Sequence, residues 1–143
     1  MMIDDVYAAL TADAILTGLL VGGIYHQRTA PEISRQYTPA AFDGDRNIKP
    51  CCLLRIADTL SIQTGLSIVT NTIEIFYYEK WNYSTIEQAR ARVRCLIDKK
   101  YILSTSVDKI ELNYMSGYTE DSALICRLLI DRYTWQEPPC EGC

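Results

Sequence analysis

The sequence predicts an α+β fold, with an antiparallel or mixed sheet of about four to five strands and two main helices packed on one face. The apolar patterns follow the order helix, long loop, two strands, helix, and then two or three strands. Strands that come in groups, with helices between the groups, are typical of this class. The length of 143 residues is close to the common size of one domain.

We expect a single domain over residues 1–136, with a long loop inserted at about 27–49 and a flexible C-terminal tail over 137–143. Neither an internal repeat nor a linker divides the chain. Its formal net charge of -4 gives no overall attraction to nucleic acid. No stretch approaches the roughly 20 apolar residues that span a bilayer. The acidic start is unlike a signal peptide, so we expect synthesis in the cytoplasm.

The N-terminal segment carries an apolar stripe that predicts helix over Asp4–Leu20. Thr11 and Asp13 are candidates for a break, with Thr11 as the cap of the second piece. Gly22 is expected to end this helix. A short strand is expected at Gly23–His26.

Residues 27–50 contain prolines, a glycine and many polar residues, so no long regular element is expected there. Loops longer than about 12–15 residues are uncommon in compact domains and are usually functional or disordered. This loop also contains Ile33, Tyr37 and Phe42. We therefore expect it to become ordered against a neighbouring molecule.

Two strands are expected next, Cys51–Asp58 and Ser67–Lys80, joined by a turn at Thr59–Leu66. The second strand has one face with Ile73, Ile75 and Tyr77, and another with Thr72, Glu74, Phe76 and Tyr78. Both faces are partly apolar, so both are expected to be covered.

The second helix is expected from Ser84 to about Asp98, with Ser84 as N-cap and Glu87 completing a capping box. Its apolar face, which should cover the sheet, consists of Ile86, Ala89, Val93, Leu96 and Ile97. Cys95 is expected on the same apolar side, as a small buried hydrophobe.

The C-terminal third predicts short strands at Tyr101–Leu103 and Lys109–Tyr114, a turn at Met115–Asp121, and a long strand at Ser122–Trp135. In the long strand, we assign to the core the face that carries Leu124, Cys126, Leu128 and Ile130.

Reactive side chains do not form a recognisable catalytic set. His26 is the only histidine, and we interpret it as a surface or interface residue. A zinc site normally needs four ligands. Cys140 and Cys143 have CxxC spacing but no second pair, because Cys51 and Cys52 are adjacent in sequence.

An acidic stretch in the long loop is also a poor metal site. Asp43, Asp45 and Asn47 alternate like part of a calcium loop, but Leu54 stands where the glutamate ligand belongs. We therefore predict no enzyme, no metal and no cofactor.

Aromatic residues and arginines give the positive signal, because Tyr, Trp and Arg are enriched at protein interfaces. The chain has ten tyrosines and two tryptophans. The interface candidates are Ile33, Tyr37, Phe42, Tyr78, Trp81, Tyr83, Arg90, Arg92, Arg94, Tyr133 and Trp135. For the aromatic residues, completion of the core and of the sheet edges remains an equal alternative.

Several segments together resemble siphophage tail terminator proteins. They are MIDDVYAALTADAILTGLL, GIYH, CCLLRIAD after Pro50, TIEIFYYE, STIEQARARVRCLID and ALICRLLIDRYTW. The resemblance is one of pattern, and it extends from about Met2 to Trp135. Head-tail connector and tail completion subunits share a similar size and layout.

The resemblance implies a homohexameric ring in the virion that caps the tail tube and presents a surface to the head-neck connector. Its implied partners are other copies of the chain, the tail tube protein and the connector protein. DNA would only pass through the lumen, and no membrane would be involved. The open alternatives are a head-tail connector or neck subunit, a non-viral protein-binding domain, and a small enzyme.

Overall fold

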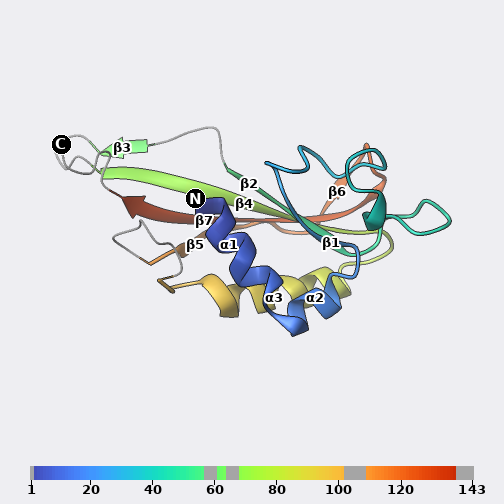
Figure 1. The fold of residues 1–143 in the computed structure, drawn as a ribbon, viewed down its shortest axis with the longest axis horizontal. Helices are drawn as coiled ribbons and strands as arrows, with labels where there is room; N and C mark the ends of the chain where they lie inside the picture. Colours follow the sequence, from blue (N-terminus) through green and yellow to red (C-terminus); the bar gives the residue numbers. More distant parts are fainter. Residues whose placement is uncertain (1, 57–60, 64–67, 102–108, 138–143) are drawn as a thin grey trace.

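The computed structural model describes residues 2–56, 61–63, 68–101 and 109–137. The helices lie on one side of a twisted sheet, and the segment over residues 27–50 lies on the other side, near one end (Figure 1). Among the described residues, no helix combines the length and the apolar character that a membrane crossing requires.

The helices and strands follow the expected order. The helices are α1 (Met2–Thr11), α2 (Ala14–Leu19) and α3 (Ser84–Ile97), with a 3₁₀ turn at Pro39–Ala41. The strands are β1 (Gly23–His26), β2 (Cys51–Ile56), β3 (Ser61–Gln63), β4 (Ile68–Glu79), β5 (Glu111–Met115), β6 (Thr119–Asp121) and β7 (Cys126–Glu137).

The sheet is mixed, as the sequence predicts. Its main strand order is β1-β2-β4-β7-β5 in the described residues, with β3 beside β4 and β6 beside β7. Strand β1 runs parallel to β2, whereas β4 and β7 pair antiparallel along most of their 12 residues each. This central pair carries the helices on one face and the long loop on the other, so the α+β prediction is confirmed.

The first helical segment is divided at the expected place, but the capping residue differs from the prediction. Asp13 is the N-cap of α2, and its carboxylate accepts a hydrogen bond from the Leu16 amide. Thr11 instead donates its hydroxyl back to the Tyr7 carbonyl within α1. Aspartate is the stronger cap when both residues are available.

Helix α3 begins without the predicted capping box. Ser84 is the first helical residue, and Tyr83 occupies the N-cap position without a side-chain cap. The amides of Thr85 and Ile86 donate instead to the carboxylate of Glu79 at the end of β4. A residue from the neighbouring strand therefore ties the start of the helix to the sheet.

Two apolar clusters lie on opposite faces of the sheet. The larger one, beneath the helices, includes Leu10, Leu16, Ile75, Val93 and Leu129. The smaller one lies under residues 27–50 and consists of Ile33, Ala41, Ile48, Cys51, Leu53, Tyr78, Cys126 and Leu128. The expectation that both faces of β4 are covered is thus confirmed.

One burial prediction was incomplete and another was wrong. On β7, Cys126 and Leu128 of the predicted face are buried in the smaller apolar cluster, which confirms their burial. The opposite face, with Leu129, Tyr133 and Trp135, is also buried and packs in the larger cluster beneath the helices. Cys95 is exposed, because α3 turns its 86, 89, 93 and 97 positions toward the sheet.

Several element boundaries also differ. The predicted turn at 59–66 includes strand β3, and the predicted turn at 115–121 includes the end of β5 and all of β6. The last strand begins at Cys126, since residues 122–125 form the turn that returns from β6. Part of the predicted strand at 101–103 lies outside the described residues.

The two faces of β7 provide a stability test. We expect Leu129→Ala to lower the free energy of unfolding by about 2–5 kcal/mol, because it opens a cavity beneath the helices. Ile130→Ala is the matched control, since Ile130 is half-buried on the loop side. Chemical denaturation of both variants measures the difference. An equal or larger loss for Ile130→Ala would contradict the assignment of faces.

Candidate functional site

An exposed apolar group lies where β4 ends and α3 begins; we call Trp81, Tyr83, Tyr118 and Ile125 the aromatic end. Trp81, Tyr118 and Ile125 are 70%, 64% and 72% exposed. The Lys80 ammonium lies 5.4 Å from the Trp81 ring centroid and donates to the Ile125 carbonyl. Lys80 thus holds the tryptophan and the β6–β7 turn together.

The tyrosines of the aromatic end are held in place by their own contacts. The Tyr83 and Tyr118 rings stack with centroids 4.2 Å apart. Tyr83 donates its hydroxyl to the Thr119 carbonyl, and Tyr118 donates to the Glu87 carboxylate. That carboxylate raises the pKa of Tyr118. An ordered, exposed aromatic surface of this kind is typical of a protein-binding site.

A second exposed group lies at the other end of α3; we call Lys99, Lys100, Tyr101 and Lys109 the lysine end. All four side chains are exposed. The Lys109 ammonium lies 5.3 Å from the Tyr101 ring centroid. The Lys99 amide donates to the Ile110 carbonyl, which holds this end of the helix beside β5.

Between these ends, Arg90 anchors the middle of α3 to the sheet. Its Nε lies 3.0 Å from Oδ1 of Asp131 on β7, and both side chains are largely buried. Its other nitrogens donate to the carbonyls of Ser116 and Ile130. The guanidinium therefore joins α3, β7 and the turn between β5 and β6.

The buried carboxyl of Asp131 has an altered titration. Burial raises its pKa from 3.8 to about 6, and the neighbouring Arg90 guanidinium limits this rise. The hydroxyls of Tyr77 and Tyr133 are also buried near this group. The cluster lies under the helices, where a macromolecular partner has no access.

The other two arginines also make ion pairs within the chain. Arg92 forms two hydrogen bonds to Asp13, and this pairing lowers the Asp13 pKa to about 2. Arg94 lies 3.5 Å from Asp98 and remains 57% exposed. Of the three arginine candidates, Arg94 is therefore the most available to another molecule.

The aromatic and apolar candidates divide into buried and exposed residues. Ile33, Tyr78, Tyr133 and Trp135 are buried in the two clusters of the chain itself. Phe42 is half-buried and lies near Arg35, while Tyr37 is exposed. The long loop is thus ordered by packing on its own sheet. Tyr83 is half-buried and packs against the larger cluster, so Tyr37 and Trp81 are the exposed candidates.

Sequence reasoning missed Tyr118, Ile125, Tyr101 and Lys109, whereas Lys99 and Lys100 follow the arginines on a stretch expected to be a solvated or interface face. Tyr118 follows Gly117 in a turn, and Ile125 has a φ of 53° at the end of the next turn. A β-branched residue in the left-handed region is strained. The exposure and the strained backbone of Ile125 point to a functional surface, and both are visible only in the folded structure.

Two adjoining hollows separate the long loop from the β6–β7 turn. One has a volume of about 380 Å³ and is lined in part by Ile33, Arg55 and Tyr78. The other, of about 570 Å³, is lined in part by Phe42 and Ile125. Both are open and of mixed polarity, so neither encloses a small molecule, and the second adjoins the aromatic end at Ile125.

Thiols and the histidine give little chemistry in the described part of the chain. Burial raises the pKa of Cys51 and Cys52 far above the usual range, and that of Cys126 to about 12, so these thiols stay protonated. His26 stacks edge-on against Tyr7. Within the described ranges, no three His, Cys, Asp or Glu side chains gather as metal ligands. Cys140 and Cys143 lie outside those ranges.

The raised pKa of Asp131 gives a prediction about pH. The folded protein binds a proton near pH 6 that the unfolded chain binds only near 3.8, so acidification from pH 7 to pH 5 stabilises the fold through this group. We expect Asp131→Asn to remove that gain, as measured by denaturation at both pH values. Equal pH dependence in the variant and the parent would contradict this. Asp13→Asn is the control, because Asp13 titrates near pH 2.

Comparison with solved structures shows a similar fold in a chain of a gene transfer agent virion. The chain aligns with one from a structure described as "Virion of native gene transfer agent (GTA) particle". The TM-score is 0.65 at 14% identity, over 92% of this chain and 90% of that chain. At this identity the likeness shows a shared fold. No protein-family model and no curated protein matched the sequence.

Proposed function

We propose that this chain is a structural subunit of a phage-like virion, without catalytic activity, that forms a ring at the junction of tail and head. The observation that carries the proposal is the fold shared, over nearly the full length of both chains, with a chain of a gene transfer agent virion. The resemblance of the sequence segments to tail terminators supports the same assignment.

Within such a virion, we assign the chain to the tail terminator position, as a homohexamer that caps the tail tube and contacts the head-neck connector. A homomeric ring requires each subunit to present two different surfaces, one for each neighbour. The aromatic end and the lysine end are two exposed surfaces of different chemistry. A head-tail connector subunit must also present two different surfaces, and the connector is the alternative position for this chain in the same assembly.

We propose no catalytic reaction because of the chemistry of the described titratable side chains. The three buried thiols have raised pKa values. Among the described carboxyl groups, Asp131 has the pKa that is raised most clearly toward neutrality. This side chain forms an ion pair with Arg90 beneath the helices. Catalytic groups need access to a substrate. Neither set meets that requirement, which favours a structural role.

Imaging and tube binding test this function together. We expect the purified chain to form rings under negative-stain electron microscopy, either alone or on the ends of tubes assembled from the tail tube protein of the same particle. A ring on the tube end supports the terminator position, whereas binding only to the connector protein supports the neck alternative. A chain that binds neither protein contradicts the proposed function.

A further inference from the structure

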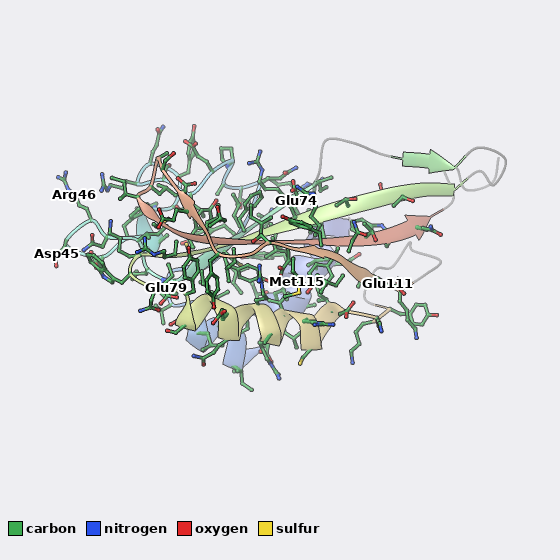
Figure 2. The ribbon with its side chains drawn as sticks, turned by 180° about the vertical axis from the view of Figure 1, so that it is seen from behind. Asp45, Arg46, Glu74, Glu79, Glu111 and Met115 are labelled. Carbon is green, nitrogen blue, oxygen red and sulfur yellow. The ribbon has the colours of Figure 1, made fainter. Side chains whose placement is uncertain are left out.

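The aromatic end and the lysine end lie at opposite termini of one helix. Helix α3 has 14 residues, which corresponds to a length of about 20 Å at 1.5 Å per residue. In Figure 2, Glu79, beside the aromatic end, and Glu111, beside the lysine end, lie toward opposite sides of the molecule. The two surfaces are therefore separate patches, and each can bind a different neighbour.

The two ends also differ in charge. Around the aromatic end, three carboxylates accompany two cations: Glu87, Glu120 and Asp121 with Lys80 and Arg127. Among the described residues of the lysine end, three exposed lysines accompany the carboxylate of Glu111, while Arg94 is paired with Asp98. The lysine end is thus cationic in a chain whose net charge is -4.

Their chemistry is complementary as well. Ammonium groups bind favourably over the faces of tryptophan and tyrosine, and more so beside carboxylates. The chain already makes such contacts internally, between Lys80 and Trp81 and between Lys109 and Tyr101. The aromatic end offers exposed rings with a carboxylate, Glu87, held against Tyr118. These are features that a lysine-rich surface would bind.

We propose that the aromatic end of one copy binds the lysine end of the next copy, so that successive α3 helices follow one another head to tail. This inference rests on the proposed ring function and names the two surfaces that close the ring. Binding between two different patches is heterologous, and it gives a closed ring when the rotation per subunit suits. A second copy is the favoured partner because one chain presents both members of the complementary pair.

Two variants test the contact, each with one end removed. Trp81→Ala with Tyr118→Ala removes the aromatic faces and leaves the lysine end intact. Lys100→Glu with Lys109→Glu reverses the charge of the lysine end and leaves the aromatic end intact. All four side chains are exposed, so the fold does not depend on their burial. Ile15→Ala, at an exposed apolar residue of α2, is the matched control.

Size-exclusion chromatography with light scattering, and imaging on tubes, give the readout. We expect the parent chain and Ile15→Ala to form rings and each end variant alone to remain monomeric. An equimolar mixture of the two end variants should form a dimer, because each retains the end that the other lacks. Formation of that dimer also shows that both variants are folded.

Two results would overturn the inference alone. They are rings formed by either end variant alone, and a mixture that stays monomeric although the parent chain forms rings. A parent chain that binds the tube as a monomer would overturn both the inference and the proposed ring. Failure of the proposed function is distinguishable, since it gives a parent chain that binds neither the tube nor the connector protein. Rings that form through other surfaces would leave the proposed function standing and remove this inference alone.

Discussion

The position of α3 depends on one buried ion pair, between Arg90 of the helix and Asp131 of β7. The two charged atoms lie 3.0 Å apart, and the same guanidinium donates to the carbonyls of Ser116 and Ile130. A buried pair adds little net stability over a well-packed apolar pair, but loss of one partner leaves an uncompensated charge. Its main consequence here is geometric, because the fork of donors fixes both the register and the rotation of the helix on the sheet.

Both termini of the helix are then tied to the sheet by separate contacts. Glu79 of β4 accepts hydrogen bonds from the first turn, and Asp98 accepts one from the Leu112 amide of β5. Trp81 and Tyr83 of the aromatic end follow Glu79 along the chain, and Lys99, Lys100 and Tyr101 of the lysine end follow Asp98. The exposed surfaces therefore flank a helix that is tied to the sheet at both termini. Such anchoring limits the conformational entropy lost when they bind a partner.

The local spacing of apolar residues was sufficient to predict the α+β class, because their period distinguishes helices from strands. It failed where a side chain outside the local pattern makes the contact that the pattern assigned to another residue. Glu79 displaces the predicted Ser84 cap, and the loop over 27–50 buries Cys126 and Leu128 on a face that therefore looked like the main core. The interface residues were harder to predict from the sequence, because composition does not distinguish the buried Trp135 from the exposed Trp81. The lysine end joins residues from both sides of a β-bridge, Lys100 with Ile110, which no local pattern reveals.

The anchoring role of the ion pair is tested most directly by a double-mutant cycle on the free energy of unfolding, with Arg90→Met, Asp131→Leu and the double variant. Because each single variant leaves a buried charge or its partners unsatisfied, each is expected to cost about 3–5 kcal/mol. The double variant should cost clearly less than the sum of the two single variants, because no buried charge is then left without its partner. Additive costs would show that Arg90 and Asp131 act independently, and would contradict the account of how α3 is held.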